Sequence, residues 1–424
     1  VPAHWVFRPI KHLALLNPRK SDFAGDTEQL CSFVPMEKLK TGVVQLDEER
    51  PIEEVIGGYT YFEDGDVLQA KVTPCFENKN VAIAKGLTNG IGFGSSEINA
   101  LRPYQGVNAD YLYYRVQEDS YMSFCTSSMI GAGGLKRVPT DVINNFKIAA
   151  PTLCEQTQIA RFLDHETARI DALIEEQQRL IELLKEKRQA VISHAVTKGL
   201  DPTVPMKDSG VEWLGEVPAH WIISQLKFNT TEMQTGPFGS QLHAEDYVDG
   251  GIPLINPAHM VDGRIIPDLQ VSVDEKTWSR LSRHALKAGE IIFARRGELG
   301  RCAVVSKEQE GWLCGTGSLK ASLNSRLSSE YAYLLVTSKG VVSELSLESK
   351  GTTMENLNTE TLGRVRLPLP PLSEQEAILE HVHEIAGQFA ALIHEAEDGI
   401  KLITERRSAL ISAAVTGKID VRNW

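Results

Sequence analysis

The sequence lacks several patterns that mark special classes of protein. Its six cysteines include no CxxC pair and no close Cys/His cluster, which argues against a zinc site or a disulfide framework. No apolar run approaches the roughly 20 residues that cross a bilayer, and no basic-then-apolar signal pattern opens the chain. We therefore expect a cytoplasmic protein with reduced cysteines.

The sequence also lacks an excess of positive charge. Its 424 residues include 44 Lys and Arg against 56 Asp and Glu, which gives a formal net charge of −12. Neutralising DNA phosphates needs clustered Lys and Arg, so the protein cannot be a uniformly basic nucleic-acid binder. Any contact with DNA must come from local basic groups or from a partner protein.

Common catalytic motifs are missing as well. The sequence has no G-x-G-x-x-G after a strand, no G-x-x-x-x-G-K-[ST] and no G-x-S-x-G, and its histidines show no ligand spacing. The segment PDLQVSVDEK contains Asp268, Asp274 and Lys276, which imitate the two carboxylates and the lysine of many Mg²⁺-dependent nucleases. The spacing is short for that motif, so we expect no catalytic residues and no metal site in this chain, with a divergent nuclease as the alternative.

What the sequence does contain is an internal duplication. The pentapeptide VPAHW occurs at residues 1–5 and again at 217–221, and PTLCEQ at 151–156 is matched by PPLSEQ at 370–375. After these motifs, Gln156 to Asp201 aligns without a gap on Gln375 to Asp420, with roughly a third of the positions identical. The whole unit has therefore been duplicated.

Each copy ends in a segment typical of a long helix. Apolar residues recur there in steps of seven or multiples of seven, the pattern of a coiled-coil seam. At about 1.5 Å per residue, some 38 residues form a rod about 55 Å long. One apolar stripe must be buried against another, so we predict that the two helices pair, although an ordinary core helix in each domain is an alternative. The predicted pairing residues are Leu163, Ile170, Leu173, Leu184, Val191, Val382, Phe389, Leu392, Ile403 and Leu410.

The segments before the helices are rich in turn residues and short β-type runs, which is typical of mixed α/β domains. The sequence thus predicts an α+β protein of two mixed globular domains, each followed by a long helix, with an internal pseudo-twofold repeat. We expect Trp5 and Trp221 to pack where each domain meets its helix. The expected boundaries are a first domain at 1–150, a first helix at 151–201, a linker at 202–216, a second domain at 217–368 and a second helix at 369–424.

Loops with polar and basic residues are the candidates for binding. In TGPFGSQLHAEDY, Gly236 and Gly239 would let the backbone approach a large partner, while neighbouring side chains offer hydrogen-bonding groups. A basic residue follows an equivalent strand in each half, Lys71 after DGDVLQA and Arg295 after AGEIIFA. Lys350 stands in the second half where MIGAGGLKRV stands in the first. On DNA such residues hold phosphates or read base edges. The candidate set is Lys71, Lys136, Arg137, Ser240, Gln241, Arg295, Arg296 and Arg301.

Taken together, the order of these parts resembles the specificity subunit of Type I restriction-modification systems over essentially the whole chain. The motifs that carry the resemblance are the two VPAHW copies, GDVL and GEII, LTNGIGFGSSEINALRP, TGPFGS, PTLCEQ and PPLSEQ.

This resemblance implies a non-catalytic subunit that recognises double-stranded DNA. Each globular domain would be a target recognition domain for one half of a split, asymmetric site, and the antiparallel helices would act as a spacer and dock two methylase (modification) subunits. The cofactors would belong to the partners, with S-adenosylmethionine in the methylase and ATP and Mg²⁺ in two restriction subunits that can join the complex. The candidate residues above take the role of DNA contacts by the same resemblance, and a coiled-coil scaffold without a DNA role is a further alternative.

Overall fold

The structure is a computed structural model that describes residues 1–424 except 24, 133, 350–356 and 423. The chain forms two compact units, each built from two stretches of sequence. Unit 1 comprises residues 1–180 and 396–424, and unit 2 comprises residues 181–395. Each unit therefore contains one globular domain, a part of the first long helix and a part of the second.

The domain of unit 1 contains two four-stranded sheets. One has the order β6-β3-β10-β7 and the other the order β2-β11-β8-β9, and a separate pair joins β1 to β14. The strands are β1 (Val6–Pro9), β2 (Ala14–Leu16), β3 (Leu30–Val34), β6 (Glu49–Pro51), β7 (Thr60–Glu63), β8 (Val67–Ala70), β9 (Val81–Ile83), β10 (Ile91–Gly94), β11 (Ile98–Pro103) and β14 (Lys147–Ala150), with the short pair β4 (Leu39–Lys40) and β5 (Val43–Val44). The helices are α1 (Ile52–Val55), α2 (Ala109–Arg115), α3 (Asp119–Ser127) and α4 (Thr140–Asn145).

The domain of unit 2 repeats the central part of this plan. Its sheet β18-β27-β24-β25 corresponds to β2-β11-β8-β9, and the pair β17-β28 corresponds to β1-β14. The second sheet, β19-β23-β20-β26, is built from shorter strands. The strands are β15 (Met206–Asp208), β16 (Glu216–Pro218), β17 (Ile222–Gln225), β18 (Thr230–Thr235), β19 (Tyr247–Val248), β20 (Ile252–Ile255), β21 (Met260–Val261), β22 (Arg264–Ile265), β23 (Ser272–Val273), β24 (Ile291–Ala294), β25 (Cys302–Val304), β26 (Leu313–Cys314), β27 (Ser318–Leu323) and β28 (Arg366–Leu369). The helices are α6 (Glu275–Leu281), α7 (Ser329–Val336), α8 (Lys339–Ser349) and α9 (Thr359–Arg364).

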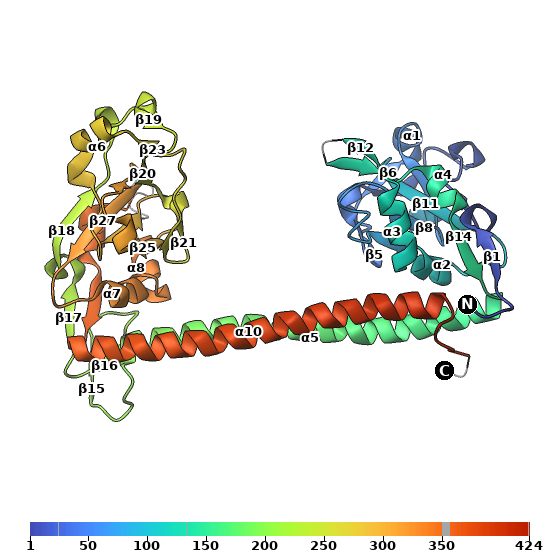
Figure 1. Cartoon of the computed structure of the whole chain (residues 1–424). Helices are drawn as coiled ribbons and strands as arrows, with labels where there is room; N and C mark the ends of the chain where they lie inside the picture. Colours follow the sequence, from blue (N-terminus) through green and yellow to red (C-terminus); the bar gives the residue numbers. More distant parts are fainter. Residues whose placement is uncertain (24, 133, 350–356, 423) are drawn as a thin grey trace. The chain divides into compact units, whose positions relative to one another are not determined.

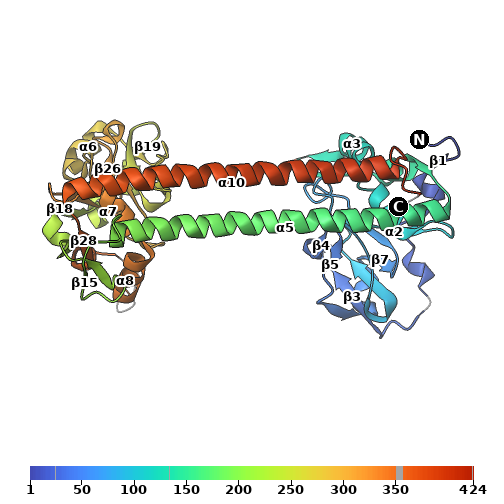
Figure 2. The ribbon, with the colours of Figure 1, turned by 90° about the horizontal axis from the view of Figure 1, so that it is seen from below.

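The two predicted long helices are α5 (Leu153–Lys198) and α10 (Leu372–Val415). Within each unit they lie side by side and run antiparallel, because the start of one packs near the end of the other (Figures 1 and 2). In unit 1 the core joins Leu163 of α5 to Ile411 of α10, and in unit 2 it joins Val196 of α5 to Val382 of α10. The predicted fold class, with two mixed domains and an antiparallel helix pair, is confirmed.

The buried positions of the helices alternate steps of three and four residues. In α5 the next position after Ile170 that faces the other helix is Ile174, and in α10 the next one after Phe389 is Ile393. Both are steps of four residues, which keep the side chain in the seam between the two helices. The predicted pairing residues Leu173 and Leu392 are instead 49% and 48% exposed, so they lie outside the seam. The other eight are buried or half-buried, namely Leu163, Ile170, Leu184, Val191, Val382, Phe389, Ile403 and Leu410.

Candidate nucleic-acid interface

Lys71 and Arg295 occupy equivalent places in the two units. Lys71 directly follows β8, and the last residue of β8 pairs with the first residue of β11. Arg295 directly follows β24, and the last residue of β24 likewise pairs with the first residue of β27. The Lys71 amide donates to Glu97 O at 3.0 Å, and the Arg295 amide donates to Gly317 O at 2.8 Å. The two similar segments, DGDVLQA before Lys71 and AGEIIFA before Arg295, therefore occupy equivalent positions in the two domains. Each places one cation at the same strand end.

The other two candidates of unit 1 lie beside Lys71. Lys136 and Arg137 belong to β13 (Leu135–Arg137), which pairs with β12 (Ile130–Ala132) as a hairpin. The hairpin is joined to the Lys71 segment by the bridge between Val72 and Arg137. The structure thus brings the three basic residues predicted for unit 1 to one edge of its domain.

Arg137 has a structural partner that the sequence did not suggest. Its Nη2 donates to Glu97 Oε1 at 2.6 Å and its Nε donates to Glu97 Oε2 at 3.0 Å. The hydrogen bonds from Arg137 are the largest cause of the lowered pKa of Glu97. The carboxylate occupies one edge of the guanidinium, so Arg137 fixes the base of the hairpin.

The candidates of unit 2 lie on two loops that leave the same end of a sheet. Ser240 and Gln241 lie in η6 (Gly239–Gln241), in the loop that follows β18. Arg295, Arg296 and Arg301 lie in the loop between β24 and β25. Strands β18 and β24 flank β27 and both end beside its first residues, so the two loops start side by side.

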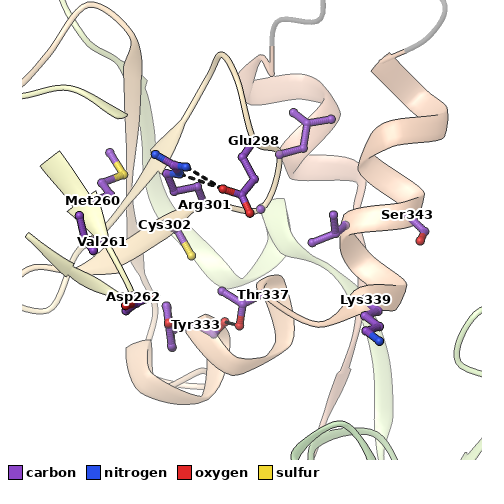
Figure 3. Close-up of a pocket in the computed structure, with 14 residues that line it drawn as sticks. Met260, Val261, Asp262, Glu298, Arg301, Cys302, Tyr333, Thr337, Lys339 and Ser343 are labelled. Carbon is purple, nitrogen blue, oxygen red and sulfur yellow. Dashed lines mark hydrogen bonds and ion pairs between the residues drawn. The ribbon is translucent and has the colours of Figure 1, made fainter. Parts of the chain in front are cut away.

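Several of these side chains already have partners within the domain. Arg295 Nε donates to Leu357 O at 3.2 Å, and Arg301 forms an ion pair with Glu298 at 2.7 Å. Glu298 and Arg301 line a cavity of about 600 Å³ in unit 2, where Figure 3 shows their paired side chains near Cys302. The contact of each candidate with DNA stays a prediction, and Lys350 lies outside the described residues.

Gly236 has a different role from the one predicted. A side chain at this position would place its Cβ 1.8 Å from Gly315 O, so the close backbone approach is internal to unit 2. Gly239 does have φ +59 and open space around it, which fits the tip of an exposed loop. Only the second of the two glycines is placed where it could allow a partner to approach.

The residues of the alternative nuclease site have local structural roles. Asp274 caps α6, because its Oδ1 accepts a hydrogen bond from the Thr277 amide at 2.8 Å. Asp268 accepts one from the Gln270 amide at 2.9 Å. No group of three or more His, Cys, Asp or Glu side chains is placed to hold a metal ion in the part of the chain that the structure describes.

The repeated VPAHW motif attaches each domain to its long helix. Trp5 is 8% exposed and Trp221 is fully buried, as predicted for packing at this junction. The Trp221 indole donates to Glu374 at 3.0 Å and the Trp5 indole donates to Glu155 at 3.4 Å. His220 and His4 contact the same two carboxylates, at 2.8 and 2.7 Å.

The glutamines of PTLCEQ and PPLSEQ make a second repeated contact. Gln156 Oε1 accepts from the Asn108 amide and Gln375 Oε1 accepts from the Ser328 amide, both at 2.9 Å. Asn108 and Ser328 are the caps of the equivalent helices α2 and α7. The sequence showed the repeat of these motifs, but it could not show that each one locks a domain helix to the start of a long helix.

A buried tyrosine in each domain contacts the end of the long helix that belongs to the other sequence copy. Tyr111 donates to Val415 O of α10 at 3.3 Å, and Tyr331 donates to Val196 O of α5 at 2.9 Å. These carbonyls lie in the last turn of each helix, where backbone acceptors lack helical partners. Each domain therefore holds the start of one long helix and the end of the other.

Among the described residues, no helix is long and apolar enough to span a bilayer.

Comparison with known proteins places the chain in a family. The model for the Type I restriction modification DNA specificity domain matches residues 77–184 and 233–401. The Type I restriction enzyme EcoEI specificity subunit of Escherichia coli is 37% identical over 162 residues, and the MjaVIII specificity subunit of Methanocaldococcus jannaschii is 25% identical over 325 residues. These matches cover 38% and 74% of this chain, but 27% and 71% of the relatives, so the chain spans only about a quarter of the E. coli subunit.

Two solved structures share the fold over 99% of this chain. A chain from a study of complex assembly and conformational transition of the type I R-M system matches with a TM-score of 0.73 at 17% identity, over 99% of that chain. The HsdS subunit from Thermoanaerobacter tengcongensis matches with a TM-score of 0.55 at 16% identity, over 98% of that chain. With two matched regions that together include more than half of its residues, the chain belongs to the Type I restriction modification DNA specificity domain family.

Proposed function

We propose that this chain is the non-catalytic DNA-recognition subunit of a Type I restriction-modification complex in the cytoplasm. Each unit would bind one half of a split, asymmetric sequence in double-stranded DNA. The equivalence of Lys71 and Arg295 carries the proposal, because it places a cation at the same strand end of two otherwise diverged domains. Phosphate contacts of this kind position a protein on DNA, while the differing loops around them would read different bases.

Partner binding is the second part of the proposal. Exposed leucines recur at matching positions of the helices, with Leu173 and Leu402 in unit 1 and Leu392 and Leu183 in unit 2. Exposed apolar groups that recur in both units indicate a docking surface for two copies of one partner. We propose that these copies are methylase subunits.

The geometry of unit 1 leaves the leucine face accessible. On α5, Asp164 points to the globular domain, where it accepts a hydrogen bond from Tyr114 at 2.8 Å. Leu173 follows nine residues later, so at 100° per residue it lies about 180° around the helix from Asp164. The leucine side chain therefore faces away from the domain.

In this arrangement S-adenosylmethionine, ATP and Mg²⁺ would bind to the partner subunits, and two restriction subunits could join the complex.

DNA methylation in cells tests the recognition role. We expect that co-expression of the chain with its methylase gives adenine methylation at one gapped motif, as read by methylome sequencing. The chain alone should leave DNA unmodified and, with Mg²⁺, should not cleave a plasmid. Absence of any new motif would refute the DNA-recognition role, and cleavage that is lost in Asp268→Ala would favour the nuclease.

Variants separate DNA binding from partner binding. Charge reversal at Arg295 and Arg296 should weaken salt-dependent binding of the assembled complex to its duplex, while the methylase still co-purifies. Conversely, Leu173→Asp with Leu402→Asp, which changes only unit 1, should remove one of the two methylase copies from the complex in size-exclusion chromatography. Arg179→Asp, an exposed change on the same helix, is the matched control and should leave assembly unchanged. A complex that keeps both methylase copies after the two leucine substitutions would exclude this face as the docking surface.

A further inference from the structure

The β12–β13 hairpin of unit 1 is a ribbon whose described residues are all exposed. Two of them are large and apolar, Ile130 at 71% exposure and Leu135 at 59%. Figure 1 shows β12 extending from the body of the domain. Apolar side chains that lie together on an exposed element, unlike singly exposed ones, mark a binding surface.

The pairing register gives this ribbon two different faces. Ala132 pairs with Leu135 and Ile130 pairs with Arg137, and paired residues share a face while successive residues alternate. Ile130, Ala132 and Leu135 therefore share one face with Arg137, whose guanidinium is paired with Glu97 at the base of the hairpin. The opposite face carries Lys136 and Gly131, where a Cβ would stand 2.2 Å from Leu135 O.

The hairpin is held on the domain by specific hydrogen bonds. The Thr73 hydroxyl donates to Gly134 O at 2.6 Å and accepts from the Lys136 amide at 2.9 Å, while the Thr73 amide donates to Lys136 O at 3.0 Å. The ion pair between Arg137 and Glu97 fixes the base. The exposed apolar face is thus presented by an anchored element.

The charge of this segment identifies the kind of partner. Between Ser120 and Thr140 the sequence has no Asp or Glu, whereas it has Lys136 and Arg137, in a chain with a net charge of −12. Because Arg137 is paired with Glu97, Lys136 carries the positive charge of the segment. A cationic segment of this kind is complementary to a polyphosphate. A two-stranded β-ribbon also fits the major groove of B-DNA, where apolar side chains contact the methyl group of thymine.

We infer that the β12–β13 hairpin enters the major groove of one half-site, where Ile130 and Leu135 contact thymine methyl groups and Lys136 lies against a phosphate. This inference rests on the proposed function and deepens it, because it names the base-reading element of unit 1. A half-site with a methylated adenine contains at least one thymine on the opposite strand, so the required methyl group is present in the target.

Replacing thymine by uracil tests the inference, because it removes only the methyl group. The complex of the chain with its methylase subunits is titrated with the target duplex and with duplexes that carry uracil in one half-site at a time. Each contacted methyl should contribute about a fourfold change in Kd, since burying one such group stabilises binding by about 0.8 kcal/mol. We expect this weakening in one half-site only.

Variants assign the effect to the hairpin. Ile130→Ala and Leu135→Ala should each weaken binding to the thymine duplex and reduce the sensitivity to uracil in that half-site. Lys136→Gln is the matched control on the other face, and it should weaken both duplexes equally and reduce the salt dependence.

Three outcomes would overturn the inference. Uracil could have no effect in either half-site, the uracil penalty could persist undiminished in both alanine variants, or Ile130→Ala could release methylase from the complex, which would make the hairpin a protein contact. Methylation of a gapped motif by the unaltered complex in the same preparation would show that the proposed function itself holds.

Discussion

A buried ion pair illustrates how single residues stabilise the two domains. In unit 2, Lys320 is 2% exposed and lies 3.2 Å from Glu290, which is equally buried. Ser322 also donates to Glu290. In unit 1 the equivalent acid is Asp66, which pairs with Arg102 at 2.9 Å. Asp66 and Glu290 are the acids of the repeated segments GDVL and GEII, where each directly follows a glycine. The similarity of these segments therefore corresponds to an ion pair at the start of a central strand in each domain.

Removing one partner of the Lys320–Glu290 ion pair should destabilise the fold. We expect Lys320→Met to reduce the free energy of unfolding by about 3–5 kcal/mol, because Glu290 is left buried without its cation. The double variant Lys320→Met with Glu290→Leu should recover much of that loss, since no uncompensated charge remains. Urea denaturation followed by circular dichroism measures both, and a double variant less stable than the single one would contradict this account.

The junction at Glu155 should depend on pH. Burial alone raises the pKa of this carboxyl, but hydrogen bonds from His4, Thr152 and Trp5 outweigh it and lower the pKa to about 2. A depressed pKa stabilises the fold fully above the ordinary value near 4.5, and this contribution is lost as the pH falls from about 4.5 to 2.

The variant Glu155→Gln tests that dependence. It should reduce the free energy of unfolding at pH 7 by about 1–3 kcal/mol, because charge-assisted hydrogen bonds become neutral ones. Thermal unfolding between pH 2 and 7 should show a smaller loss of stability for the variant than for the unaltered chain. Equal pH profiles would mean that Glu155 does not supply the acid-sensitive contribution.

Apolar residues on the long helices differ widely in how much each contributes to the stability of the fold. Leu163 is fully buried in the core of unit 1, whereas Leu173 is half exposed on the same helix. Leu163→Ala should reduce the free energy of unfolding by about 2–5 kcal/mol, and Leu173→Ala should change it by less than about 1 kcal/mol. A large effect at Leu173 in the isolated chain would place it in the seam, contrary to its exposure.

The sequence predicts elements better than it predicts contacts. Heptad spacing is enough to predict that the two helices pair, whereas their antiparallel direction was implied by the family resemblance. Choosing Ile174 over Leu173 as the seam residue requires knowing where the step of four falls, which depends on the opposing helix. The equivalence of Lys71 and Arg295 was visible because both follow a strand of the same pattern. The pairing of Arg137 with Glu97 was not visible, because these residues are 40 positions apart and meet only through tertiary structure.

At the scale of the whole molecule, the compact units do not coincide with the sequence copies. Unit 1 takes residues 1–180 from the first copy and 396–424 from the second. Tyr111 and Tyr331 show why, because each binds a carbonyl of the helix that belongs to the other copy. A single chain with both copies therefore completes both units, and α5 and α10 each pass from one unit to the other.

The continuity of these helices leads to a prediction about the DNA target. We expect that a copy of residues 174–180 inserted after Leu180, together with a copy of residues 389–395 inserted after Glu395, lengthens both helices by one heptad in register. Seven residues add about 10 Å, which corresponds to about three base pairs of DNA at 34 Å per 10 base pairs. Methylome sequencing should then show the same two half-sites separated by a longer gap. Insertion in α5 alone is the control, because it makes one helix about 10 Å longer while its partner keeps its length. The two domains could then no longer each hold one start and one end of the helices, so methylation should be abolished. If the double insertion methylates a motif with the original gap, the helices do not set the spacing of the half-sites.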